Sequence, residues 1–148
     1  MDRTDRTILS HMQRDATLSV ADLAELAGVS KSACWRRIQK LEAGGTIRRR
    51  VTLLDPPALN LSLTVFIAVK TNRHNQQWAE NFKAVTEGMP GVLEVYRMGG
   101  DVDYMIKALV KNMPGYDALY QELIRADLFD VSASFVMEEL KQTTELPL

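Results

Sequence analysis

The chain has 148 residues, of which 46% are hydrophobic and 25% charged, and its formal net charge is −1 at pH 7. This composition is typical of a globular protein with one domain or two small ones. No apolar run approaches the ~18 residues that a transmembrane helix needs, and the N-terminus opens into a helical pattern rather than a signal peptide. The sequence therefore predicts a cytoplasmic protein with no membrane partner. Its single cysteine, Cys34, excludes an intramolecular disulfide and is expected to be a small core residue.

Charge is divided unevenly along the chain. Residues 1–60 carry 10 basic and 7 acidic side chains, a net of +3, whereas residues 61–148 carry 8 and 12, a net of −4. Asp55, Pro56 and Pro57 mark the boundary, because consecutive prolines block a helix and restrict the residue before them. We therefore expect two domains, residues 1–51 and 62–148, joined by a linker over residues 52–61.

The first expected elements are two helices near the N-terminus. Asp2 is a typical cap for a helix over Arg3–Arg14, whose inward positions repeat at helical spacing. A second helix is predicted to start at Val20, because Ser19 and Asp22 have the spacing of a capping box.

A third helix follows after a sharp turn. Gly28 stands where a left-handed residue ends the second helix, and Ser30 can cap a helix from Lys31 to about Ala43. Two glycines then stop this helix. Its predicted buried stripe consists of Cys34, Ile38 and Leu41. Two helices joined by a short turn that contains glycine indicate a helix-turn-helix unit.

The exposed face of the third helix is basic. Between Lys31 and Arg50 the chain has seven basic residues and one acidic residue, a local net charge of +6. A solvated face usually mixes both signs, so we interpret this face as a surface that neutralises DNA phosphates and reaches base edges in the major groove. The candidate DNA-binding residues are Lys31, Ser32, Arg36, Arg37, Gln39, Lys40, Arg48, Arg49 and Arg50.

Two features near this helix carry further expectations. Residues Thr46–Leu54 are rich in β-branched and basic side chains, which predicts a short hairpin or wing beside the recognition helix. Trp35 lies at the flank of the buried stripe. It can either contact a DNA sugar or pack against the first helix, and its position favours packing.

Beyond residue 61 the periodicity changes. It predicts a strand over 63–71, a helix from the Asn75 cap to Gly88, strands over 92–98 and 102–110, a helix over 115–126, and a last strand over 131–137. Trp78 and Phe82 are expected in the core. The order matches a ferredoxin-like βαββαβ arrangement, in which both helices cover one face of a four-stranded antiparallel sheet. The fold class is therefore α+β.

The second face of this sheet is expected to be apolar and open. Phe66, Ala68 and Val136 would line it, and an exposed apolar face of this size is usually covered by a partner. The sequence thus predicts a homodimer, which would present two recognition helices to the two half-sites of a palindromic operator.

The loop from Met98 to Tyr104 is a candidate ligand site. Its glycines let backbone amides approach a ligand carboxylate, and Asp101 or Asp103 can hold an ammonium group. From spacing alone, a simple hairpin turn is the favoured interpretation. The two aspartates have no partner for acid–base chemistry, and no histidine has a second metal ligand at suitable spacing. No catalytic residue, metal or cofactor is predicted.

Five ordered segments resemble the Lrp/AsnC (feast/famine) family of transcriptional regulators over nearly the whole chain. They are Asp5–Leu9, Leu23–Ser30, Cys34–Glu42 with Gly45 and Ile47, Gly100–Tyr104, and Lys141–Leu148. The resemblance implies a winged helix-turn-helix domain followed by a βαββαβ domain that responds to a ligand. It also implies dimers that often assemble into octamers, with amino acids bound between dimers. Trp35 and the segment from Ser134 to Lys141 look most like the subgroup that responds to cysteine.

The same resemblance favours an effector site at the loop over a simple turn. The residues that it implies are Met98, Gly99, Gly100, Asp101, Asp103 and Tyr104, with Ser132, Ser134, Thr143 and Thr144 contributed by another subunit. The leading interpretation is a sequence-specific transcriptional regulator that binds double-stranded DNA and a small amino acid. Two alternatives remain open: an architectural DNA-binding protein with little sequence preference, and a ferredoxin-like enzyme with a helical appendage.

Overall fold

The computed structural model describes Met1–Leu148 and divides the chain into two compact units. The helical unit consists of Met1–Leu53 and Leu140–Leu148, and the sheet unit consists of Leu54–Glu139. The sequence-based division placed the last nine residues with the second domain. They group instead with the helices, because residues 145 and 146 bond to side chains of the first helix. No helix is long and apolar enough to cross a membrane.

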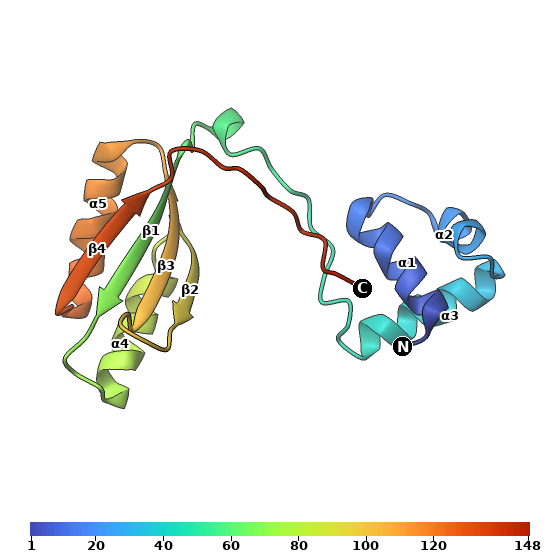
Figure 1. Cartoon of the computed structure of the whole chain (residues 1–148), viewed down its shortest axis with the longest axis horizontal. Coiled ribbons are helices and arrows are strands. Elements are labelled where there is room, and N and C mark those ends of the chain that lie inside the picture. The colour runs from blue at the N-terminus through green and yellow to red at the C-terminus, as the bar shows by residue number, and fades with distance from the viewer. The chain divides into compact units, whose positions relative to one another are not determined.

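Three helices form the helical unit: α1 (Arg3–Arg14), α2 (Val20–Leu26) and α3 (Lys31–Ala43) (Figure 1). Their predicted starts are confirmed, because the caps act as the sequence indicated. Asp2 and Ser19 each form a capping box, and the Ser30 hydroxyl accepts from the amide at position 33. Gly28 adopts φ +65°, a conformation that costs glycine little, and it ends the turn after α2.

The core of the helical unit fixes how α3 is rotated about its axis. Ile8 from α1, Leu23 from α2, and Cys34 and Ile38 from α3 are each at most 3% exposed. Burial raises the pKa of the Cys34 thiol, since desolvation disfavours the thiolate. Cys34 is therefore a small core residue, as predicted. The opposite side of α3 is left facing outward.

A charged contact joins the start of α1 to the middle of α3. The Arg37 guanidinium donates through Nη1 to Oδ2 of Asp2 and to Oδ1 of Asp5, each at 2.7 Å. The two carboxylates also accept from each other's backbone amides in the capping box. Arg37 thus bridges the cap of one helix and the middle of another.

The predicted hairpin over Thr46–Leu54 is wrong, because this segment forms no strand. Ile47 anchors it to the helical unit, because its amide donates to the carbonyl of Leu41 and its side chain packs on the helical core. The segment has no neighbouring strand with which to pair, and a single strand is not stable without one. Arg48, Arg49 and Arg50 therefore lie on an exposed, irregular segment.

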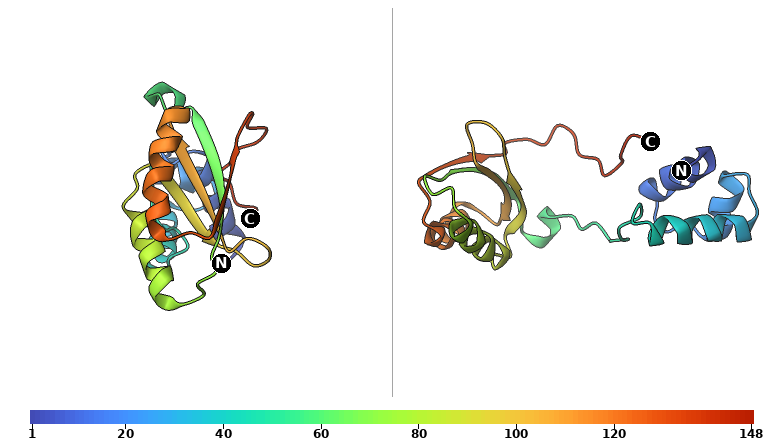
Figure 2. Two further views of the ribbon diagram at one scale, coloured as in Figure 1. Left: turned by 90° about the vertical axis from the view of Figure 1, so that its left-hand side faces the viewer. Right: turned by 90° about the horizontal axis from the view of Figure 1, so that it is seen from below.

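The sheet unit has the predicted order of elements. A 3-10 turn, η1 (Pro57–Leu59), is followed by β1 (Leu63–Lys70), α4 (Gln76–Glu87), β2 (Val92–Arg97), β3 (Tyr104–Val110), α5 (Met113–Leu123), η2 (Ile124–Ala126) and β4 (Asp130–Phe135). All three strand pairs are antiparallel, and the sheet order is β2-β3-β1-β4. Both helices lie on one face of the sheet (Figure 2), as the ferredoxin-like prediction requires.

Several boundaries differ from the prediction by one to three residues. Helix α5 starts at Met113 rather than residue 115, because the Asn112 side chain accepts from the amide of Gly115 and so acts as the cap. Strand β4 ends at Phe135, and Met137 is 94% exposed instead of continuing the alternation. The shorter strand agrees with its register, because the last residue pair between β4 and β1 is Phe135 with Val65.

The core of the sheet unit lies between the sheet and its two helices. Val65, Ile67 and Val69 of β1 are fully buried, and Trp78 and Phe82 of α4 pack against them. This confirms that both aromatic residues belong to the core. The Trp78 and Phe82 rings stack with centroids 5.1 Å apart, and the Tyr104 ring lies 4.7 Å from that of Phe82.

The other face of the sheet carries no helix. Phe66 lies on this open face, is 39% exposed and stands opposite Lys107 on β3 and Ser134 on β4. The strand register places on the same face Thr64, Ala68, Lys70, Glu94, Tyr96, Met105, Leu109, Asp130 and Ser132. We call these twelve residues the open sheet face, on which Lys107 pairs with Glu94 at 3.3 Å.

The contact of Arg37 with Asp2 and Asp5 makes stability depend on pH in the acid range. Backbone hydrogen bonds within the capping box, together with Arg37, lower the pKa of both aspartates below the ordinary value of 3.8. A lowered folded-state pKa stabilises the fold above pH 3.8, and this stabilisation is lost as the pH falls through the folded-state values. We expect Arg37→Met to melt several degrees below wild type at about pH 6, with a smaller difference at about pH 2.

Circular dichroism melts of the full chain measure this effect. Arg3→Met is the matched control, because Arg3 lies on the same unit and forms no ion pair. A melting difference of equal size at both pH values would show that Arg37 does not act through the aspartates.

Candidate nucleic-acid interface and ligand loop

Helix α3 presents one exposed stripe opposite its core stripe. Ser32, Arg36, Gln39 and Lys40 are all exposed, whereas the intervening Cys34 is buried. The helix begins directly after the turn that follows α2. These residues therefore have the placement of a recognition helix, whose N-terminal side chains reach base edges.

Most cations at this surface are unpaired within the chain. Lys31, Arg36, Lys40, Arg48 and Arg49 form no ion pair, so their charges are available to an outside anion. Unpaired cations on a folded surface repel one another. A polyanion that binds there relieves this repulsion and releases its own counterions.

Glu42 holds two other predicted residues in place. Its carboxylate accepts from Nε2 of Gln39 at 3.0 Å and from Nη2 of Arg50 at 2.9 Å. The single acid of the basic stretch thus tethers the segment after α3 to the helix. Both tethered side chains remain exposed at the surface.

Arg37 is placed differently from the other eight predicted DNA-binding residues. It is engaged by Asp2 and Asp5 at 2.7 Å, and its side chain is 33% exposed. The structure therefore assigns Arg37 to the contact between α1 and α3, and not to the exposed stripe.

Trp35 does not lie in the helical core. It is 52% exposed and lines an open hollow with Val20 of α2 and the first turn of α3. The favoured interpretation, packing against the first helix, is therefore wrong. A side chain between the core stripe and the exposed stripe can be either buried or exposed, and the residue type alone does not decide which of the two occurs.

The loop between β2 and β3 is a tight hairpin. The amide of Met98 donates to the carbonyl of Asp103 at 2.8 Å, and Gly100 adopts φ +120°, a conformation that L side chains rarely adopt. Space around Gly99 and Gly100 is open, since a Cβ at either position would meet nothing within 4 Å. The loop therefore exposes its backbone, as a carboxylate-binding loop requires.

Two loop residues have structural duties. The Asp103 carboxylate accepts through Oδ2 from the amide of Thr71 at 2.8 Å, which ties the hairpin to the end of β1. Tyr104 packs on Trp78 and Phe82. The second carboxylate oxygen of Asp103 has no protein hydrogen bond, and Asp103 is one of the residues that line a cavity of about 410 Å³.

Two arginines and a histidine that the sequence does not single out also line this cavity. They are Arg73 and His74 before α4 and Arg97 at the end of β2. Arg73 also pairs with Asp127 at 3.1 Å. Only their placement around the hairpin distinguishes them, because each is an isolated charge in a polar segment of the sequence.

The four remaining effector candidates fall into two places. Ser132 and Ser134 are exposed on the open sheet face, and Thr143 and Thr144 are exposed in the C-terminal segment of the helical unit.

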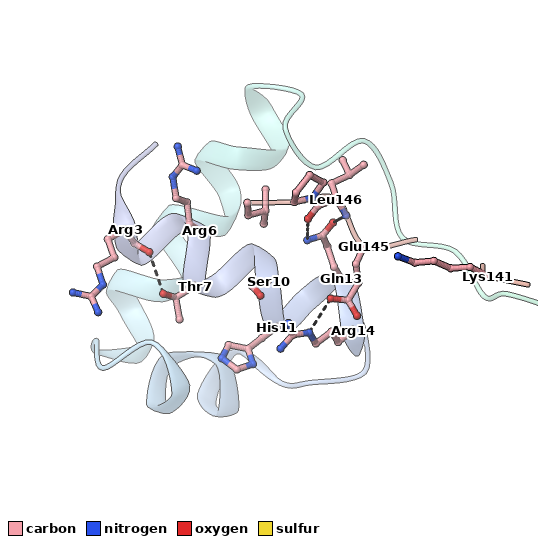
Figure 3. Close-up of a pocket in the computed structure, with 12 residues that line it drawn as sticks. Arg3, Arg6, Thr7, Ser10, His11, Gln13, Arg14, Lys141, Glu145 and Leu146 are labelled. Carbon is pink, nitrogen blue, oxygen red and sulfur yellow. Dashed lines mark hydrogen bonds and ion pairs between the residues drawn. The ribbon is translucent and has the colours of Figure 1, made fainter. Parts of the chain in front are cut away.

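The C-terminal segment binds to α1 by paired polar contacts (Figure 3). The Gln13 side chain donates to the carbonyl of Leu146 at 3.3 Å and accepts from its amide at 2.6 Å. Arg14 Nε lies 2.9 Å from Glu145 Oε2. Because both bonding groups of the Leu146 backbone are satisfied by one side chain, this contact fixes the position of the segment on the helix.

Comparisons with known proteins agree with these two units. Residues 1–42 match the model of the AsnC-type helix-turn-helix domain, and residues 64–146 match that of the Lrp/AsnC ligand binding domain. The glutamate uptake regulatory protein of Zymomonas mobilis is 48% identical, over 100% of this chain and 91% of that protein.

Solved structures give the same result over the whole length. An AsnC family transcriptional regulator from Agrobacterium tumefaciens has a TM-score of 0.95 and 50% identity, and the match covers 99% of this chain and 97% of that one. A transcriptional regulator of Neisseria meningitidis, solved as a complex with L-methionine, has a TM-score of 0.93 and 33% identity, with 99% and 96% covered. The chain therefore belongs to the Lrp/AsnC family of transcriptional regulators, proteins that bind DNA and are not enzymes.

Proposed function

We propose that this regulator acts as a homodimer, or as an octamer assembled from four dimers, that inserts α3 of each protomer into the major groove of a specific operator. The observation that carries this proposal is the exposed stripe of α3 with its unpaired cations. Phosphate contacts from Lys31, Arg48 and Arg49 would set the position on DNA. Ser32, Arg36, Gln39 and Lys40 would face base edges, and Arg50 would flank the groove. From the proposed DNA-binding role we also infer a cytoplasmic location.

The dimer is proposed to form through the open sheet face. Phe66 lies at the centre of this face, which no helix covers. Its exposure of 39% is unusual for an aromatic residue on a central strand. A second copy of the same face would cover it by two-fold symmetry. Pairing of two sheet units would then deliver two helical units to one duplex.

The effector is proposed to be a small amino acid bound at the loop from Met98 to Tyr104. The exposed backbone of Gly99 and Gly100 and the nearby cations suit an α-carboxylate, while the free oxygen of Asp103 suits an α-ammonium group. Asp101 is the second candidate for the ammonium. Ser132, Ser134, Thr143 and Thr144 of another protomer would complete the site.

Removing single cations from the α3 surface tests the DNA proposal. We expect Arg36→Ala and Arg49→Ala each to raise the Kd for operator DNA roughly tenfold, because each removes a charge-assisted contact. Arg49→Ala should also reduce the salt dependence of log K by about one. Fluorescence anisotropy over a range of salt concentrations measures both quantities.

Arg125→Ala is the control, because Arg125 is exposed and unpaired but lies on η2 of the sheet unit. Unchanged affinity and salt slope in both α3-surface variants would contradict the proposed interface.

A thermal-shift screen of the standard amino acids tests the effector proposal. A ligand that binds the native state raises its melting temperature with concentration. Asp103→Asn keeps an oxygen to accept from Thr71 but removes the negative charge, so we expect most of the shift to be lost while the ligand-free melting temperature changes little. Asp117→Asn, on the exposed side of α5, serves as the control.

Failure of every amino acid to shift the wild-type melting temperature would count against an amino-acid effector. A full shift in Asp103→Asn would remove Asp103 from the site.

A charged residue introduced at the centre of the open sheet face tests the proposed dimer interface. We expect Phe66→Asp to sediment as a monomer at micromolar concentration, because it would bury two unpaired carboxylates across the two-fold axis. Met113→Asp, at the exposed start of α5, should keep the wild-type sedimentation coefficient. Dimers of unchanged stability in Phe66→Asp would place the dimer interface elsewhere.

A further inference from the structure

The two tryptophans of this chain have opposite environments. Trp78 is 5% exposed, and its indole Nε1 donates to the carbonyl of Asp127 at 2.9 Å. Trp35 is 52% exposed, and its indole N–H has no hydrogen-bond partner in the protein. Packing and hydrogen bonding therefore account for Trp78 and leave Trp35 unexplained. Tryptophan is costly to expose and is enriched where a partner covers it.

Trp35 lies on α3 between the buried stripe and the exposed stripe, next to two of the proposed base-reading residues. At about 100° per residue, its direction is about 40° from that of Gln39 and about 60° from that of Ser32, and about 100° and 140° from those of Arg36 and Lys40. Buried Cys34 and Ile38 hold the helix in this rotation. A duplex that meets Ser32 and Gln39 would therefore also meet the Trp35 ring.

The hollow beside Trp35 offers mainly apolar surface to such a partner. It has a volume of about 760 Å³ and is lined by Val20, Ser30, Lys31, Ser32 and Trp35. The hydroxyls of Ser30 and Ser32 lie 3.2 Å apart and bond to each other, and that of Ser30 also accepts from the amide at position 33. Ser30 is therefore satisfied locally, whereas the Ser32 hydroxyl makes one bond and can still form another. The groups left to bind a partner are the indole, the Val20 side chain, the Lys31 cation and the Ser32 hydroxyl.

We propose that Trp35 reads thymine by packing its indole against a thymine C5-methyl group in the major groove. The inference rests on the proposed insertion of α3. The surrounding cations favour DNA as the occupant, and the thymine methyl is the apolar group that a base pair displays at the major-groove edge. Trp35 thus adds an apolar specificity contact to the polar contacts of Ser32, Arg36 and Gln39.

Replacement of thymine by deoxyuridine isolates this contact, because it removes only the methyl group. Duplexes that bind tightly are first selected from a random library with the full-length protein, and each thymine is then replaced in turn. We expect one position at which deoxyuridine weakens wild-type binding about fourfold, the effect of burying one methyl-sized group. Trp35→Ala should bind the thymine and deoxyuridine duplexes equally at that position, and should keep the wild-type salt slope because no phosphate contact is lost.

Trp35→Phe keeps an aromatic ring and should retain part of the preference for thymine. Because Trp35 is half exposed, all variants are expected to melt near the wild-type temperature, which thermal denaturation checks. A deoxyuridine effect of the same size in wild type and Trp35→Ala overturns the inference. The inference is also overturned if the wild type binds every deoxyuridine duplex as tightly as the thymine duplex. It is overturned as well if Trp35→Ala changes the oligomeric state and leaves the DNA affinity unchanged.

Arg36→Ala separates failure of this inference from failure of the proposed function. If Arg36→Ala weakens binding while Trp35→Ala leaves the thymine preference intact, α3 binds DNA and Trp35 does not read thymine. If neither substitution affects binding, the DNA interface itself lies elsewhere.

Discussion

The fixed rotation of α3 is the constraint on which the DNA interface depends. Cys34 and Ile38 are buried against α1 and α2, so the remaining faces of the helix cannot turn inward. Deleting buried methyl groups typically costs 2–5 kcal/mol for a change such as Ile→Ala, which is large beside the ~1 kcal/mol of an exposed ion pair. Apolar packing therefore sets where the cations point. The polar contacts add local definition: Arg37 holds the start of α1, and Glu42 holds Gln39 and Arg50.

In the sheet unit, apolar packing likewise determines which surface is exposed. One face of the sheet is covered by α4 and α5, and the other is left with Phe66 at its centre. The hairpin after β2 exposes the backbone of its glycines, and only one oxygen of the Asp103 carboxylate accepts a hydrogen bond from the protein. Strands β1 and β3 connect the proposed ligand site to the open sheet face. Asp103 bonds to the residue after β1 and immediately precedes β3, and both strands carry residues of that face. This connection gives a short physical route between ligand binding and assembly.

Much of this architecture could be predicted from the sequence, because the signals are local. Asp2, Ser19 and Ser30 cap helices whose starts follow directly, and the strand periodicities give the βαββαβ order. Thr46–Leu54 was misread because β-branched residues favour a strand only where a partner strand exists. The role of Arg37 could not be foreseen, since its carboxylate partners lie 35 and 32 residues earlier in the chain. The cavity residues Arg73 and Arg97 likewise meet only after folding.

The central claim is that two copies of α3 enter one duplex in a fixed register. A hydroxyl-radical footprint of the full-length protein on a selected operator tests it most directly. The account predicts two protected segments related by two-fold symmetry, with centres about 10 base pairs apart or a multiple of that spacing, and no such pattern on random DNA. Uniform protection that ignores sequence, or a single protected segment, would contradict it.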